Sequence, residues 1–295
     1  MTDYVDIINP LAEMVKRVEP SLTFNMIEIG ALPMSEKVER FHSLLSLFPG
    51  SKISAFELNE EQCVKWNKEA PEGLKYYPVA LGEKKEQRNL YETRSPMCTS
   101  LYKPNAPLLS VFNRLDVVTL QSESYVQTIS LDEFVQANKI GSIDFIKIDV
   151  QGAEYDIFKG AASVLKSTVF VVSEVEFVPL YESQPLFGDV TEILSKNDLM
   201  FHKFLALNGR PIKQVKINGN PRHPSQHLWS DAIYLSDLSV SEKHSSSDWA
   251  KCAIFSFLYG SSDVTYFCLK QLDNVHGSAL ASDFIARVAS LELES

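Results

Sequence analysis

Two kinds of segment alternate along most of this chain. Between residues 24 and 236, short runs rich in β-branched and aromatic residues take turns with segments whose apolar residues recur at helical spacing. Such alternation is typical of βαβ units and a mainly parallel sheet. About seven sheet strands are expected, near residues 24–30, 52–58, 74–81, 143–150, 168–177, 200–206 and 232–237. The pattern therefore predicts an α/β fold in which helices flank a seven-stranded, mainly parallel sheet.

Two regions depart from this alternation. Residues 83–128 contain further strand-like runs and an irregular Pro- and Ser-bearing stretch, which is more often a functional lid than filler. Residues 239–295 read as two or three helices, so we expect an α-helical appendage after a main domain at 1–238 that includes an N-terminal helix. The apolar cluster at 255–259 could pack on the main domain or be buried between the subunits of a homo-oligomer.

Composition excludes several classes of protein. The 38 acidic residues outnumber the 28 basic ones, giving a net charge of −10, so a phosphate backbone would be bound against the overall field and nucleic acid is not an expected partner. The four cysteines show no C-x-x-C spacing, which favours a reducing compartment. We expect no signal peptide and no membrane span, hence a cytoplasmic protein.

The residues that end the predicted strands suggest a ligand site, because parallel sheets bind ligands at the carboxyl ends of their strands. Gly30 after the first strand permits a tight turn, and Glu57 after the second could accept both hydroxyls of a ribose or could be a solvated strand end. The segment EIGALPMSE lacks the second and third glycines of a G-x-G-x-x-G phosphate-binding loop, which argues against a nicotinamide-dependent oxidoreductase.

Two longer segments resemble a known family. VQTISLDEF at 126–134 and IDFIKIDVQGAEYDIFKGA at 143–161 are similar to the T-L-D and K-I-D-V-E-G-A-E elements of the FkbM methyltransferases, with Gln151 in place of the first motif glutamate. The resemblance covers about residues 24–236. It implies a Rossmann-like fold, S-adenosylmethionine as cofactor, and an acceptor hydroxyl on a saccharide or small-molecule metabolite. The cofactor contacts it suggests, together with the strand-end residues, are Glu28, Gly30, Ala31, Glu57, Leu58, Ala80, Ser100 and Asp149.

Methyl transfer to a hydroxyl requires orientation of the nucleophile and a proton acceptor. Asp149 ends the strand of the motif, and strand alternation directs Glu174 and Glu176 from the next strand to one face. These carboxylates could act as bases or hold a divalent cation, although no metal is predicted. Alternatively, Glu174 or Glu176 could merely pair with Lys147 or with a backbone amide. His227 is the fourth catalytic candidate because histidine titrates near neutrality, and His202 is a weaker one.

An alternative function stays open at this point. A chain that kept the fold while its first glycine loop changed could be a catalytically silent binding or scaffolding protein. Co-purified adenosyl ligand would argue against that alternative.

Overall fold

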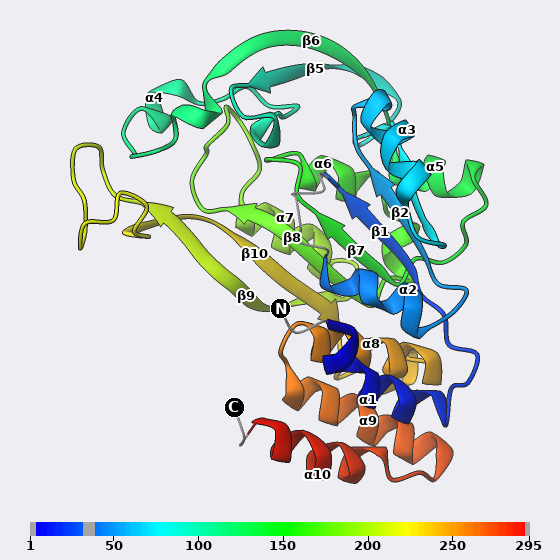
Figure 1. Ribbon diagram of the computed structural model, residues 1–295. Helices are drawn as coiled ribbons and strands as arrows, with labels where there is room; N and C mark the ends of the chain where they lie inside the picture. The colour runs from blue at the N-terminus through cyan, green and yellow to red at the C-terminus, as the bar shows by residue number, and fades with distance from the viewer. Residues whose placement is uncertain (1–3, 32–38, 293–295) are drawn as a thin grey trace.

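The computed structural model describes residues 4–31 and 39–292, and a seven-stranded sheet forms its centre (Figure 1). The strand order is β3-β2-β1-β7-β8-β10-β9, and every neighbouring pair is parallel except those of β10, which is antiparallel to β8 and β9. These strands are β1 (Asn25–Ile29), β2 (Lys52–Phe56), β3 (Leu74–Tyr77), β7 (Phe145–Ile148), β8 (Phe170–Glu176), β9 (Leu199–Arg210) and β10 (Gln226–Ser236). The predicted seven-stranded, mainly parallel sheet is thus confirmed.

The strand order reverses between β1 and β7. The chain runs outward from β1 through β2 to β3 and then crosses to the other side of β1, where β7 begins the second half of the sheet. Loops that leave two such strands diverge to opposite sides and open a crevice at their carboxyl ends. This edge of the sheet is therefore where a ligand site is expected.

A second, three-stranded sheet arches over that edge (Figure 1). It consists of β4 (Ala80–Leu81), β5 (Glu86–Thr93) and β6 (Leu120–Ile129), in the order β4-β6-β5. The single strand predicted at 74–81 was wrong, because a tight turn at Pro78, closed by a 2.9 Å bond from Val79 N–H to the Tyr77 carbonyl, separates β3 from β4. Between β5 and β6 lie η2 (Pro96–Cys98), α4 (Ala106–Leu109) and η3 (Asp116–Val118).

Helices cover both faces of the main sheet. One face packs against α1 (Tyr4–Lys16), η1 (Arg40–His42), α2 (Ser43–Leu47), α3 (Glu60–Glu69), α8 (Ser246–Leu258), α9 (Ser262–His276) and α10 (Leu280–Glu292). The other packs against α5 (Leu131–Ala137), α6 (Glu154–Lys159), η4 (Val164–Lys166) and α7 (Phe187–Ser195). A short η5 (Ser241–Lys243) precedes α8. The apolar spacing of residues 38–48 predicts a helix with Ser35 as its N-cap; the structure describes this segment only from residue 39, with η1 and α2 in it, and Ser35 lies outside the described residues.

The C-terminal helices share a hydrophobic core with the sheet. Phe255 of α8 is fully buried, and its ring stacks on Phe145 of β7 at 4.7 Å and meets Phe24 edge-on at 5.3 Å. α1 contacts both α8 and α10, so the first and last helices of the chain lie together at the end opposite the small sheet (Figure 1). The apolar cluster at 255–259 therefore packs on the main domain, while the homo-oligomer and the domain boundary at 238 stay predictions. Among the described residues, no helix combines the length and apolar character needed to cross a bilayer.

Candidate active site

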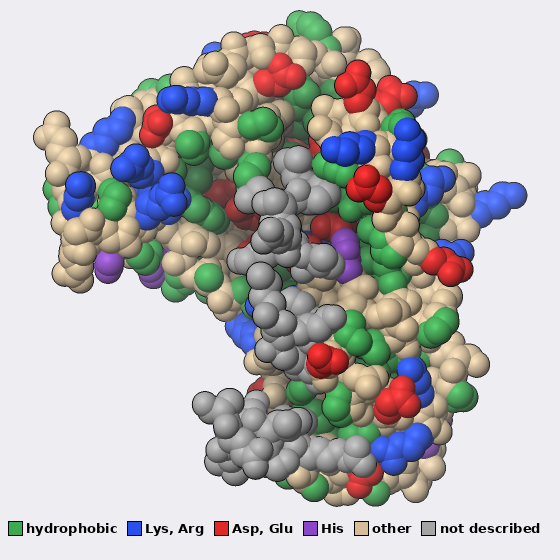
Figure 2. All heavy atoms as spheres, viewed as in Figure 1, with side chains coloured by type: hydrophobic (Ala, Val, Ile, Leu, Met, Phe, Trp, Pro, Cys, Tyr) green, Lys and Arg blue, Asp and Glu red, His purple; other side chains and the backbone are tan. Residues whose placement is uncertain are grey.

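Acidic side chains from neighbouring strands meet at the carboxyl edge of the sheet. Asp149 follows β7, Glu174 and Glu176 belong to β8, and Asp231 of β10 stands opposite Glu174 in the antiparallel pairing. Val175 packs into the core on the other face, which confirms that Glu174 and Glu176 share one face. In Figure 2, acidic side chains lie deep in the middle of the face shown. Together with Glu154, the first residue of α6, the side chains of Asp149, Glu174 and Glu176 are called the carboxylate cluster below.

Gln151 links the members of this cluster. Its side-chain Nε2 donates to Asp149 Oδ1 at 2.8 Å and to Glu174 Oε2 at 2.5 Å. Its Oε1 accepts from the hydroxyl of Tyr181 at 3.1 Å. The backbone of Gln151 is left-handed, with φ of 59°, and its carbonyl accepts from Ser100 Oγ at 2.7 Å. A neutral amide can bridge two carboxylates because it donates two hydrogens, which an ionised glutamate cannot do.

Burial changes the proton affinity of the cluster. It raises the pKa of Glu154 to about 8, although the Val150 N–H donates to Glu154 Oε1 at 2.9 Å and favours the ionised form. It also raises the pKa of Glu174 and of Glu176 well above the usual range, and the charge of Asp149 adds to both shifts. Burial therefore disfavours the ionised forms of Glu154, Glu174 and Glu176, and groups whose pKa is shifted in this way are frequent at sites of proton transfer.

Lys147 supplies a positive charge beside the cluster. Burial alone would lower the pKa of its ammonium, but the surrounding carboxylates, Asp149 first among them, outweigh burial and raise it. Its Nζ lies 3.8 Å from Glu39 Oε1. Burial raises the pKa of Asp231, and Lys147 counteracts that shift. Lys147 thus interacts with Asp149, Glu39 and Asp231. The alternative in which it pairs with Glu174 or Glu176 is not what the structure shows.

The turn after β1 approaches β7 very closely. Gly30 has φ of 80°, and a Cβ added there would lie 1.9 Å from the carbonyl oxygen of Asp149. The N–H groups of Gly30 and Ala31 donate to the Phe56 carbonyl at 3.2 and 3.0 Å. Only glycine fits this position, so the turn places backbone from β1, β2 and β7 in contact. The FkbM sequences usually read D-x-G-A-N-x-G here, and Leu32 and Met34, which replace the asparagine and the last glycine, lie outside the described residues.

The other proposed cofactor residues have different surroundings. Glu57 is partly buried at the end of β2, its Oε1 accepts from Asn59 N–H at 3.1 Å, and burial raises its pKa. The side chain of Leu58 is exposed. Ala80 is buried in β4, hydrogen-bonded to β6 rather than to the main sheet. Glu28 is turned toward His42, whose Nε2 lies 2.8 Å from Glu28 Oε2.

Comparison with known proteins assigns the family. Residues 23–201, more than half of the chain, match the methyltransferase FkbM domain. The protein belongs to the FkbM methyltransferase family. A segment of 75 residues is 35% identical to the 2-O-methyltransferase NoeI of Sinorhizobium fredii and covers 25% of this chain and 31% of that protein. A segment of 58 residues is 33% identical to the hexuronic acid methyltransferase AglP of Haloferax volcanii and covers 20% and 24%.

The solved structures compared with this chain resemble it only distantly. A precorrin-6y C5,15-methyltransferase from Geobacter metallireducens has a TM-score of 0.35 at 11% identity, covering 76% of this chain and 86% of that one. The N-terminal domain of EvdMO1, solved with SAH bound, has a TM-score of 0.34 at 9% identity, with coverage of 80% and 82%. We therefore assign the fold from the strand order of the sheet and not from these likenesses.

Part of the FkbM sequence motif has a packing role. The Asp132 carboxylate accepts from the N–H groups of Ser163 and Val164, so it caps η4. A Cβ on Gly160 would lie 2.5 Å from the Gly82 carbonyl oxygen, which ties the end of α6 to the loop after β4. These residues hold α6 and thereby its first residue, Glu154, in the cluster.

The two histidine candidates lie away from the cluster. His227 is exposed on the part of β10 that precedes its pairing with β8, and its partner across β9 is Gly209. His202 Nε2 lies 2.8 Å from Ser261 Oγ, and burial lowers its pKa. Ser100, predicted to contact the cofactor, uses its hydroxyl to donate to Gln151 and to accept from Tyr102 N–H at 2.9 Å. A role of His227 in catalysis stays a prediction.

Sequence reasoning did not assign Gln151, Glu154 or Asp231 to the site. Asp231 had a usable signal, since it is the acid within an otherwise apolar strand segment, WSDAIYL. Glu154 and Gln151 stood in the motif, but their roles depend on contacts with β8 that are distant in sequence. Across residues 4–31 and 39–292, no three His, Cys, Asp or Glu side chains are arranged to hold a metal ion.

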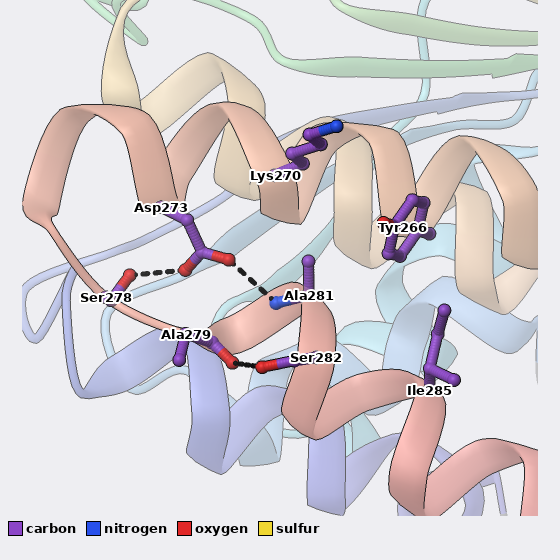
Figure 3. A pocket seen from close by; sticks show the side chains of 8 residues that line it. All are labelled: Tyr266, Lys270, Asp273, Ser278, Ala279, Ala281, Ser282 and Ile285. Carbon is purple, nitrogen blue, oxygen red and sulfur yellow. Dashed lines mark hydrogen bonds between the residues drawn. The ribbon is translucent and has the colours of Figure 1, made fainter.

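A shallow pocket of about 500 Å³ lies elsewhere, between α9 and α10 (Figure 3). Its acidic side chain, Asp273, accepts from Ser278 Oγ at 2.6 Å and from the N–H groups of Leu280 and Ala281 at 2.6 and 2.9 Å. These bonds cap the start of α10. Asp273 is therefore a structural residue, and we assign no chemistry to this pocket.

Proposed function

We propose that this protein is an S-adenosylmethionine-dependent O-methyltransferase that acts on a hydroxyl group of a saccharide or small-molecule metabolite. The observation that carries the proposal is the pair Asp149 and Glu174, two carboxyl groups that one Gln151 amide holds together at the carboxyl edge of the sheet. The family supports the reaction type, and the names of the two relatives, a 2-O-methyltransferase and a hexuronic acid methyltransferase, support a saccharide acceptor.

The residues present fit the cofactor. Gly30 lets the first turn pass close to Asp149 without a side chain in the way, and Glu57 offers a partly buried carboxylate to the ribose hydroxyls. Gly30, Ala31, Glu57 and Asp149 are the residues we propose to contact it, with Glu28, Leu58, Ala80 and Ser100 as further candidates. When bound, S-adenosylmethionine supplies an electrophilic methyl group on a sulfonium.

The carboxylate cluster provides what the acceptor hydroxyl needs. A hydroxyl that donates to the Asp149–Glu174 pair is oriented by that bond, and its proton passes to a carboxylate oxygen of the pair as the hydroxyl oxygen is methylated. Because the pKa of Glu174 is raised, its ionised form is a stronger base than the carboxylate of an exposed glutamate. Glu176 adds a further buried carboxyl group on the same face, and Lys147 and Asp231 interact electrostatically with Asp149. We propose no metal in this reaction.

Calorimetry with S-adenosylmethionine tests the first half of the proposal. We expect the wild-type protein to bind it and Glu57→Gln to bind about 10- to 100-fold more weakly, since a hydrogen bond to a charged group contributes roughly 1.5–3 kcal/mol. Glu61→Gln is the matched control, because Glu61 is exposed in the first turn of α3. Absence of binding by the wild-type protein would contradict the proposal.

Transfer of a labelled methyl group to a panel of glycosides and hydroxylated metabolites tests the second half. Asp149→Asn should lower the rate by about 10²- to 10⁴-fold, the range expected for loss of a general base. Cofactor binding without transfer to any acceptor would instead favour a catalytically silent binding or scaffolding protein.

A further inference from the structure

Arg210, the last residue of β9, has no acidic partner among the residues that the structure describes. Its Cζ lies 4.7 Å from the centre of the Trp229 ring, and its Nη1 donates to the Gly209 carbonyl at 2.7 Å. The Nε atom is buried and makes no hydrogen bond with any described residue. Across residues 4–31 and 39–292, no carboxylate forms an ion pair with Arg210, and the neighbouring charge is that of Arg222.

This arrangement is unfavourable unless an anion completes it. Burial, with the like charge of Arg222, lowers the pKa of Arg210, yet a guanidinium stays charged at any physiological pH. A half-buried charge is ordinarily paired, and this chain has ten more acidic than basic residues from which a partner could come. The Trp229 ring fixes the plane of the guanidinium, and a fixed fork of donors suits bidentate binding of a carboxylate or phosphate.

The position of Arg210 connects it with the carboxylate cluster. Trp229 stands opposite Glu176 in the pairing of β10 with β8, so both side chains lie on the face that carries Glu174 and Asp231. Arg210 lies over the ring of Trp229, one step further from the cluster. Lys and Arg side chains also gather on the side of the molecule that carries α4 and the β9–β10 hairpin (Figure 2). An acceptor that extends from the cluster across Trp229 therefore meets a cationic group.

We propose that Arg210, held by Trp229 and assisted by Arg222, binds an anionic group of the acceptor, which is therefore an acidic saccharide carrying a carboxylate or a phosphate. The inference rests on the proposed function and names its substrate class. The anion is bound at Arg210 while a hydroxyl of the same molecule faces the carboxylate cluster. A neutral sugar would leave the guanidinium unpaired, so the subsite selects against it.

Ligand-detected NMR titration tests the subsite without any methyl transfer. The probes are methyl β-D-glucuronide, glucose 6-phosphate and the neutral methyl β-D-glucoside. We expect saturable binding of at least one anionic probe, about tenfold or more tighter than that of the glucoside, and the comparison of the two anionic probes identifies carboxylate or phosphate. Arg210→Met should weaken binding of the anionic probe about tenfold or more, and Arg210→Lys should weaken it less.

Two controls make the result decisive. Lys213→Met removes an exposed charge from the same hairpin and should change binding less than twofold. Arg210→Lys keeps the charge and provides a second variant if Arg210→Met does not fold. Equal binding of the neutral and anionic probes, no saturable binding of either anionic probe, or wild-type binding by both Arg210 variants would overturn the inference. Failure of the proposed function would appear separately, as absent binding of S-adenosylmethionine.

Discussion

Gln151 Nε2 lies 2.5 Å from Glu174 Oε2 and holds that carboxyl group next to Asp149. The FkbM motif, as it is usually written, has glutamate at the position of Gln151. In this protein the neutral amide supplies two hydrogen-bond donors to a site that already contains four carboxyl groups.

Gln151→Glu should shift the activity toward higher pH. An added carboxylate next to Glu174 raises the pKa of Glu174 further, so less of the ionised base is present at a given pH. We expect the rising limb of kcat/KM against pH to move up by about one unit or more, with activity at neutral pH reduced about 10- to 100-fold. Profiles measured from about pH 6 to 10 test this, with Gln127→Glu on the exposed face of β6 as the control. Superimposable profiles of Gln151→Glu and wild type would contradict it.

Gly30→Ala should destabilise the protein far more than another glycine substitution at positive φ. The new Cβ would meet the Asp149 carbonyl oxygen at 1.9 Å, whereas a Cβ on Gly219, at φ of 74°, meets nothing within 4 Å. Gly219→Ala should lower the free energy of unfolding only by the cost of placing alanine in the left-handed conformation, about 1–2 kcal/mol. Urea unfolding should give Gly30→Ala an additional loss of about 2 kcal/mol or more. Equal losses in the two variants would mean that the close contact is relieved at little cost.

Glu154→Gln should make stability less dependent on pH. The pKa of Glu154 is about 8 in the folded protein against an ordinary 4.5, so the folded state keeps a proton that the unfolded chain releases as pH rises between these values. The free energy of unfolding of the wild-type protein therefore falls as the pH rises from about 4.5 to 8. Over the same range the free energy of unfolding of the variant should fall less, by roughly 1–3 kcal/mol. Free energies of unfolding at about pH 5, 7 and 8.5 measure the difference, and Glu61→Gln should behave like wild type. Parallel curves for Glu154→Gln and wild type would refute the expectation.

Phe255→Ala tests whether the C-terminal helices are integral to the core. Phe255 is fully buried against Phe24, Phe145 and Phe170, and its truncation should cost about 3–5 kcal/mol. Phe267, on α9, is 36% exposed, so Phe267→Ala should cost about 1 kcal/mol. Thermal and urea unfolding compare the two variants. A loss of less than about 1.5 kcal/mol in Phe255→Ala would indicate that α8 unfolds independently of the sheet.

The sequence by itself determined the class of fold and the edge at which the site lies. Periodicity distinguishes strands from helices, and the residues at the predicted strand ends include Gly30, Glu57, Asp149, Glu174 and Glu176. Both features can be read from the sequence because they depend only on neighbours in the chain. The prediction of a single strand at 74–81 was wrong, because Pro78 divides this apolar run between β3 of the main sheet and β4 of the small sheet.

Only the tertiary structure decided which side chains meet. Gln151 and Glu174 are 23 residues apart in the sequence, and Asp231 lies opposite Glu174 because β10 pairs with β8. Arg210 stands out because no acidic side chain of the described chain pairs with it. Burial likewise depends on every element packed around a group, which is why the raised pKa of Glu154 could not be inferred from its place in the motif. Proton affinity and charge compensation are properties of the assembled site, and local sequence does not encode them.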